Sequence, residues 1–184
     1  MSKVCQYFFA CHSPWTYLGH ERLIEMTRKH GAQIEVRPFD LGKVFGVSGG
    51  LPLAKRAPQR QAYRLTELAR WSAFLGIPLN PQPKFFPVSP ELANKMVVAA
   101  RLTNGVDVAL ALAGAIMRGL WAEEKNIGDE ETPVQIAGAC DLDGRALLKS
   151  AETASVFGSP WYVLDGESYW GQDRLDFLER ALQK

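Results

Sequence analysis

The order of the expected secondary-structure elements constrains the fold of this chain more than any other feature. Apolar spacing predicts a strand over residues 4–10, a helix over residues 15–29 and a second strand over residues 33–39. A connection this short between two strands implies a right-handed crossover, so the strands should lie parallel in one sheet. The chain is therefore expected to begin with the βαβ unit of an α/β fold.

The middle of the chain carries helical patterns only. Glycine-rich residues 42–53 predict a loop, and the four prolines of residues 81–90 predict an extended connection. The spacing of apolar residues predicts five helices, over residues 59–74, 91–102, 107–121, 132–140 and 143–154.

The C-terminal part returns to strand patterns. Two strands are predicted over residues 161–164 and 168–170, with Asp165-Gly166 as the hairpin turn, and a terminal helix over residues 172–183. This order, βαβ, then helices, then ββα, is that of a thioredoxin-like fold with an insertion. We expect a discontinuous thioredoxin-like domain at residues 1–44 and 150–184, and an inserted all-helical domain at residues 45–149.

Ser13-Pro14-Trp15-Thr16 stands between the first predicted strand and its helix. In thioredoxin-like folds a Cys-x-x-Cys redox pair occupies this junction, whereas here Ser13 and Thr16 place hydroxyls at its first and fourth positions. A hydroxyl forms no disulfide, but it donates a hydrogen bond to the thiolate of another molecule. The motif therefore predicts a protein that uses a thiol carried by a bound molecule.

The cysteines of the chain, Cys5, Cys11 and Cys140, contain no Cys-x-x-Cys pair. Their odd number argues against a disulfide framework and a structural zinc site, so no metal is expected. Cys5 is predicted to point into the sheet core. Cys11 is predicted to be a loop or packing residue rather than a redox centre, because free cysteine commonly behaves as a small hydrophobe.

The three histidines show no ligand spacing with any cysteine. His12 lies beside Ser13, and its alternatives are a loop residue or a general base, which requires a geometry that sequence does not supply. His20 and His30 are expected on the surface of the first helix.

Ser159-Pro160 precedes the third predicted strand. In thioredoxin-like folds a cis-proline at this point faces the N-terminus of the first helix, and the backbone of the residue before it pairs with a bound peptide. The alternative is an ordinary trans-proline in a loop, which is the commoner state of X-Pro bonds. Together with the Ser13 motif and the order of elements, the pattern favours the cis form.

With these residues in view, the chain resembles the family of kappa-class glutathione transferases and 2-hydroxychromene-2-carboxylate isomerases, a DsbA-like branch of the thioredoxin superfamily. The resemblance extends over essentially the full length. It rests on four segments, residues 7–19, 85–87, 156–160 and 169–175.

The resemblance implies that glutathione is the cofactor. It matches Ser13 to the serine that hydrogen-bonds the glutathione sulfur, and Ser159 with Pro160 to the backbone that holds the cysteinyl part. It matches Gln172 and Asp173 to the pair that binds the γ-glutamyl end, where a carboxylate suits an ammonium group.

Three departures from the family pattern concern the rest of the glutathione site. Gly50 stands where the family often has asparagine, and Glu67 replaces an aspartate four residues after Tyr63. The lysine that contacts the glycine carboxylate falls on Arg60 or, with a gap, on Lys55; Arg60 is preferred.

The first functional hypothesis is glutathione-dependent isomerisation of 2-hydroxychromene-2-carboxylate to trans-o-hydroxybenzylidenepyruvate. Ser13 and the N-terminus of the first helix would lower the pKa of the glutathione thiol, and the thiolate would add to the conjugated substrate and later be eliminated. The substrate carboxylate is assigned to Arg60, Lys55 or Lys43 without a ranking. Aromatic residues such as Trp15 and Phe86 are expected to flank the substrate ring, although Trp15 serves packing equally well.

Two other functions use the same fold. A kappa-like transferase would conjugate glutathione to an electrophile and would lack the carboxylate-binding group. A third possibility is a thiol-disulfide oxidoreductase or a non-enzymatic thioredoxin-like binding protein. The lack of Cys-x-x-Cys argues against oxidoreductase chemistry, which would require Cys11 to form a mixed disulfide with glutathione.

Charge and hydropathy narrow the partners. The formal net charge of +1 gives no reason to expect nucleic acid or an anionic membrane surface. No stretch reads as a signal peptide or approaches transmembrane length, so a cytoplasmic location is expected. The resemblance alone implies a homodimer.

Overall fold

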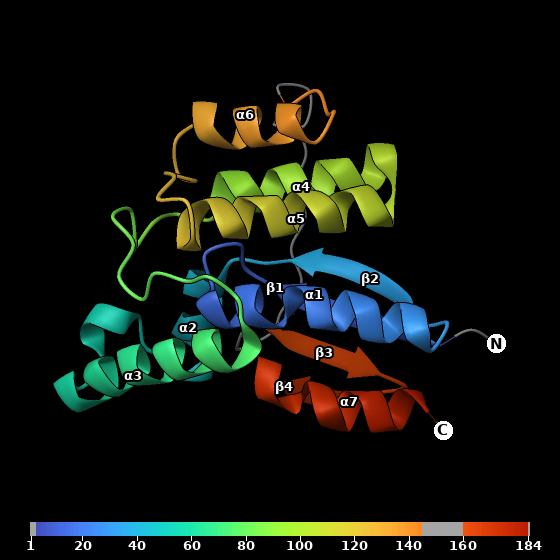
Figure 1. Cartoon of the computed structure of the whole chain (residues 1–184), viewed down its shortest axis with the longest axis horizontal. Coiled ribbons are helices and arrows are strands. Elements are labelled where there is room, and N and C mark those ends of the chain that lie inside the picture. Colours follow the sequence, from blue (N-terminus) through green and yellow to red (C-terminus); the bar gives the residue numbers. More distant parts are fainter. Residues whose placement is uncertain (1–2, 145–159, 184) are drawn as a thin grey trace.

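The computed structural model describes residues 3–144 and 160–183 (Figure 1). The predicted helix over residues 143–154 falls almost wholly outside the described residues, and so does Ser159. The predicted cis bond between Ser159 and Pro160 is therefore not described. In the described part of the chain, no helix is both long and apolar enough to cross a membrane.

The sheet has the predicted four strands, in the order β2-β1-β3-β4. β1 (Val4–Phe9) pairs in parallel with β2 (Gln33–Pro38), which confirms the βαβ unit. β3 (Trp161–Leu164) runs antiparallel to both β1 and β4 (Glu167–Trp170). Asp165 and Gly166 join β3 to β4 with positive φ angles of 51° and 84°, as the tightest hairpin turns require.

The helices follow the predicted spacing closely in the described residues. Gly76, in the left-handed conformation, ends α3, and the proline-rich residues 81–90 form neither helix nor strand, although their Phe86–Pro87 bond is cis. The helices are α1 (Pro14–Lys29), α2 (Leu41–Ser48), α3 (Pro58–Leu75), α4 (Glu91–Asn104), α5 (Val106–Trp121), α6 (Glu131–Ala139) and α7 (Leu175–Leu182), with 3-10 turns η1 (Leu53–Lys55) and η3 (Gln172–Arg174).

The predicted loop over residues 42–53 is wrong, because α2 occupies most of it. The Asp40 side chain accepts hydrogen bonds from the backbone N–H groups of Gly42 and Lys43 and so caps the helix. Val44 packs against Phe8 and Phe39. Capping and burial outweigh the low helix propensity of the glycines in this segment.

One hydrophobic core joins the parts of the chain that the sequence assigns to two domains. It contains Tyr7 and Phe9 of β1, Leu23 of α1, Ile116 of α5 and Leu178 of α7. Figure 1 shows α4 and α5 side by side above α1, and α7 below it. The division at residues 44 and 150 stays a prediction, and the two parts share their buried apolar surface.

The alternation of β1 side chains separates two faces of the sheet. Cys5, Tyr7 and Phe9 belong to the main core, and Cys5 is fully buried, as predicted. Phe8 points to the other face and forms a small cluster with Phe39 and Val44.

His20 is buried at 1% exposure, so its predicted surface position is wrong. Its Nε2 lies 3.0 Å from the Leu110 carbonyl oxygen, which can only accept, so Nε2 carries the hydrogen. Nδ1 is then the acceptor for the Tyr7 hydroxyl at 3.1 Å. Burial lowers the pKa of His20 to about 4, so its imidazole is neutral at neutral pH.

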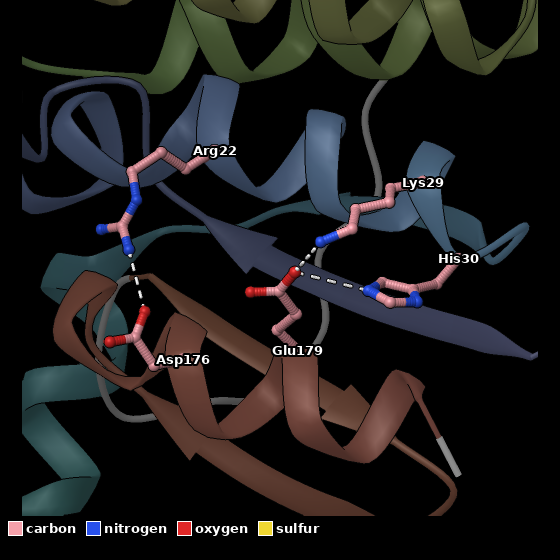
Figure 2. Close-up of polar contacts among 5 residues, drawn as sticks. All are labelled: Arg22, Lys29, His30, Asp176 and Glu179. Carbon is pink, nitrogen blue, oxygen red and sulfur yellow. Dashed lines mark hydrogen bonds and ion pairs between the residues drawn. The ribbon is translucent and has the colours of Figure 1, made fainter.

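His30 is only partly exposed, and it belongs to a set of ion pairs that tie α1 to α7 (Figure 2). Arg22 contacts Asp176 at 3.1 Å, and Lys29 contacts Glu179 at 2.7 Å. Such solvent-exposed pairs contribute about 1 kcal/mol or less each. These pairs orient α7, which follows directly on η3, and η3 contacts the first helix at Gly19 and Arg22.

Candidate active site

Ser13 is the N-cap of α1 and is 4% exposed. Its Oγ accepts a hydrogen bond from the Thr16 backbone N–H at 3.3 Å, and its own N–H donates to the Ala10 carbonyl at 2.9 Å. These bonds fix the hydroxyl at the junction between β1 and α1. A serine hydroxyl can both accept and donate a hydrogen bond, and a bound thiolate requires a donor.

The first turn of α1 favours an anion. This turn contains no acidic residue. The last turn of the helix contains Arg28 and Lys29, whose positive charges complement the negative pole of the helix dipole. Pro14 occupies the first helical turn, where a missing N–H costs nothing. The first turn itself therefore supplies no acidic side chain to neutralise the positive pole beside Ser13.

Asn94 of α4 holds the loop that carries Ser13. Its Oδ1 accepts from the Cys11 backbone N–H at 3.1 Å, and its Nδ2 donates to the Phe39 carbonyl at 2.9 Å. The side chain is 5% exposed. It thus joins the end of β1 to the end of β2, a role that no local sequence pattern signals.

The cysteine nearest to Ser13 is unreactive by its surroundings. Cys11 is fully buried, and burial raises the pKa of its thiol far above the usual range. Burial likewise raises the pKa of Cys5 to about 12. Because the thiolate is the reactive form of cysteine, the packing role predicted for Cys11 agrees with its environment.

Gly19 lets η3 approach α1 closely. A Cβ on Gly19 would lie 2.7 Å from the Gln172 Cβ and 3.0 Å from the Tyr162 hydroxyl oxygen. Gly19 is six residues beyond Ser13, or roughly 9 Å along the helix axis. The Gly171 N–H donates to the Pro160 carbonyl at 3.0 Å, so the turn before η3 is joined to the start of β3.

The structure therefore brings Pro160 close to the turn that carries Gln172 and Asp173, and Gln172 contacts α1. Gln172 is buried, and its Oε1 accepts from the Arg22 guanidinium at 3.2 Å, so its side chain anchors the turn. Asp173 is exposed and pairs with Arg174 at 2.7 Å. Asp173 is thus the accessible carboxylate at this end.

Phe86 lies beside the loop that carries Ser13. Its ring stacks on the His12 imidazole, with 6.4 Å between centroids. Burial lowers the pKa of His12 to about 4, although the Asp40 carboxylate opposes the shift. The imidazole of His12 is therefore neutral at neutral pH, and its low affinity for a proton makes it a weak general base.

Arg64 is the residue at this site that sequence reasoning missed. Its Cζ lies 5.0 Å from the Phe86 centroid and 5.7 Å from the Trp121 centroid. Arg56, Arg60 and Arg64 recur at four-residue intervals, and this spacing was the available signal. Arg60 and Arg64 lie one turn apart on α3, whereas Arg56 precedes the helix in extended backbone. We call these three residues the arginine row.

The other residues predicted to contact the substrate are exposed or only partly buried. Arg60 and Lys55 are exposed, at the start of α3 and in η1. Lys43 is exposed on α2 and lies 3.8 Å from the Asp40 carboxylate. Trp15 is partly buried in the first turn of α1.

The structure explains two departures from the family pattern. A Cβ on Gly50 would overlap the ring of Phe45, which the Arg56 guanidinium covers at 5.9 Å. Glu67 pairs with Arg70 at 2.9 Å on the outer side of α3. Neither position places a polar side chain toward Ser13.

This geometry accompanies a full-length family match. The model of the DSBA-like thioredoxin domain matches residues 4–183. The chain belongs to the DSBA-like thioredoxin family. The described structure agrees, because its four-stranded sheet and helices are those expected for a thioredoxin-like fold with helices between its two parts.

Curated relatives and a solved structure confirm the resemblance to the isomerase and kappa-transferase group. A 2-hydroxychromene-2-carboxylate isomerase of Sphingobium xenophagum is 28% identical, with 99% of both chains covered. Glutathione S-transferase kappa 1 of Caenorhabditis elegans is 25% identical, covering 97% of this chain and 90% of its own. The solved structure of a 2-hydroxychromene-2-carboxylate isomerase superposes on this structure with a TM-score of 0.78 at 25% sequence identity. The match covers 98% of this chain and 94% of that one.

Proposed function

We propose that this protein is a glutathione-dependent isomerase that converts 2-hydroxychromene-2-carboxylate to trans-o-hydroxybenzylidenepyruvate in the catabolism of aromatic hydrocarbons. The observation that carries the proposal is the Ser13 hydroxyl at the N-cap of α1, where redox members of the fold hold a cysteine. The full-length similarity to curated isomerases supports the choice of reaction.

The chemistry of the donor set fits glutathione. Ser13 and the positive pole of α1 suit a thiolate, the exposed carboxylate of Asp173 suits an ammonium group, and Arg60 suits the glycine carboxylate. Pro160 lies beside Asp173 through the Gly171 hydrogen bond. When bound, glutathione supplies a nucleophilic sulfur to the conjugated substrate and is recovered unchanged.

The residues of this chain act mainly on charge and position. A free thiol has a pKa of about 8.5, and a hydrogen bond from Ser13 together with the helix dipole lowers it, so more thiolate is present at neutral pH. Phe86 and the partly buried Trp15 offer apolar surface for the substrate ring. Ser13 holds the sulfur at one fixed point beside them.

A kappa-like glutathione transferase is the second candidate, because it would use the same thiolate site and because kappa transferases are among the relatives. The arginine row favours the isomerase. Cations close enough to influence one another's pKa suit an acidic substrate better than a neutral electrophile. The buried, unreactive Cys11 speaks against the thiol-disulfide alternative.

Calorimetric titration with glutathione tests the thiolate site. Wild-type protein should bind glutathione and lower the pKa of its thiol, read from the ultraviolet absorbance of the thiolate. Ser13→Ala should lose the pKa shift and lower kcat about a hundred- to a thousandfold, as when one donor to a developing anion is removed. No binding of glutathione by wild-type protein would refute both glutathione-dependent functions.

Ser13→Asp is the matched control for folding. Aspartate caps a helix as well as serine does, so this variant should keep wild-type stability, whereas Ser13→Ala should lose about 1 kcal/mol. Its negative charge should nevertheless repel a thiolate. Assays with the chromene acid and with chlorodinitrobenzene then separate isomerase from transferase.

We further predict a cytoplasmic homodimer, which light scattering and cell fractionation would check.

A further inference from the structure

The arginine row is a group of like charges without partner acids. Burial and then the charge of Arg60 lower the pKa of Arg56, and burial and then Arg56 lower that of Arg64. No ion pair between described residues includes any of the three. Arg70 of the same helix, by contrast, is paired with Glu67.

Arg64 is the inner member of the row. Its guanidinium lies over the rings of Phe86 and Trp121, a cation–π contact that uses none of its N–H donors in a conventional hydrogen bond. Nη2 is buried and has no hydrogen-bond partner among the described residues. A buried donor without an acceptor costs about 1–3 kcal/mol, and more when it is charged.

Arg64 keeps its positive charge at neutral pH. Its pKa is lowered to about 10, chiefly by burial, and this value is still well above 7. A carboxylate bound at the guanidinium edge would supply both the missing acceptor and the missing countercharge. Arginine suits that role because its planar fork matches the two carboxylate oxygens.

Phe86 connects Arg64 to the sulfur site. One ring contacts both the Arg64 guanidinium and the His12 imidazole, and His12 adjoins Ser13 in the chain. The Nδ1 of His12 is also buried without a hydrogen-bond partner in the described part of the protein. Two unsatisfied polar atoms thus flank one aromatic ring beside Ser13.

We propose that Arg64 binds the carboxylate of an aromatic acid substrate whose conjugated part lies against Phe86. The assignment of this acid as the second substrate rests on the proposed function. Arg64 replaces Arg60, Lys55 and Lys43 in this role, because those three side chains are exposed and pair with anions weakly in water. Arg60 is left for the glycine carboxylate of glutathione.

The test compares trans-cinnamate with its neutral analogue trans-cinnamamide by calorimetric titration without glutathione. Wild-type protein should bind cinnamate about ten- to a hundredfold more tightly, as a charge-assisted hydrogen bond predicts. Arg64→Met should reduce this ratio to about one. Arg70→Met, the matched control on the same helix, should keep it. Equal affinities in wild-type protein, or an unchanged ratio in Arg64→Met, would overturn the proposal.

A second measurement avoids the variant, in case Arg64→Met does not fold. Phenylglyoxal modifies arginine side chains, and peptide mass spectrometry reads each site in wild-type protein. Cinnamate should slow modification of Arg64 but not of Arg70, whereas cinnamamide should protect neither. Equal rates at Arg64 with and without cinnamate would contradict the assignment. Loss of glutathione binding would refute the proposed function alone, because neither measurement contains glutathione.

Discussion

At the scale of single residues, Asn94 decides where the Ser13 loop lies. Asn94→Ala removes the acceptor of the Cys11 N–H and the donor to the Phe39 carbonyl, and both groups are in the interior. Each buried backbone group left without a partner costs about 1–3 kcal/mol. We expect the free energy of unfolding in urea to fall by about 2–4 kcal/mol, and glutathione affinity to fall with it.

Asn104→Ala is the control for this substitution. Asn104 is exposed at the last turn of the same helix, where a change typically stays within about 0.5 kcal/mol. An Asn94→Ala protein with the urea midpoint of wild type would show that the two hydrogen bonds contribute no net stability.

The residues that sequence reasoning found and missed differ in a physical way. Ser13 was predictable because its role follows from local order, a strand, a hydroxyl and a helix start. Asn94 and Arg64 were not, because each acts on segments distant in the chain, the ends of two strands for Asn94 and Phe86 with Trp121 for Arg64. His20 was misplaced for the same reason, since its partners Tyr7 and Leu110 come from β1 and α5.

At the scale of elements, helix and strand patterns were reliable wherever one face is buried. The βαβ start, the hairpin and α3 to α6 follow from apolar spacing alone. The exception, α2, contains two glycines and only one buried residue, Val44. Its cap at Asp40 and its contact with Phe8 on the second face of the sheet stabilise it, and neither is visible as a periodic pattern.

The contact between α1 and η3 is the element-scale feature that the site depends on. Gly19→Ala would place a methyl group 2.7 Å from the Gln172 Cβ, and Gln172 is held in place by Arg22. Overpacking of this kind costs about 1–3 kcal/mol. We expect a lower urea midpoint and weaker glutathione binding, because η3 and Asp173 must move away from α1.

Gly46→Ala is the same substitution where space is open, since no atom lies within 4 Å of its Cβ position on α2. It should be neutral or stabilise by up to about 1 kcal/mol, because alanine is the better helix former. Equal stability of the Gly19→Ala and Gly46→Ala proteins would mean that the close approach of η3 imposes no constraint.

At the scale of the whole molecule, two histidines make the folded state sensitive to acid. The pKa values of His12 and His20 are lowered by burial from 6.5 to about 4, so the folded protein excludes a proton that the unfolded chain binds. The stability that these groups contribute is therefore complete above pH 6.5 and is lost as the pH falls toward 4. Paired carboxylates such as Glu35, whose pKa is lowered from 4.5, lose their contribution only at lower pH.

Comparing the free energy of unfolding in urea at pH 7 and at pH 5 measures the contribution of the two buried histidines. We expect a loss of about 2 kcal/mol for each of the two histidines over this interval. His20→Gln keeps a donor for Leu110 and an acceptor for Tyr7 but does not titrate, so it should halve the loss. His30→Gln, at the partly exposed end of α1, should leave most of the loss in place. A loss that is the same in wild-type and His20→Gln proteins would mean that the Tyr7–His20–Leu110 contact accommodates a charged imidazole, and that the acid sensitivity of the fold arises elsewhere.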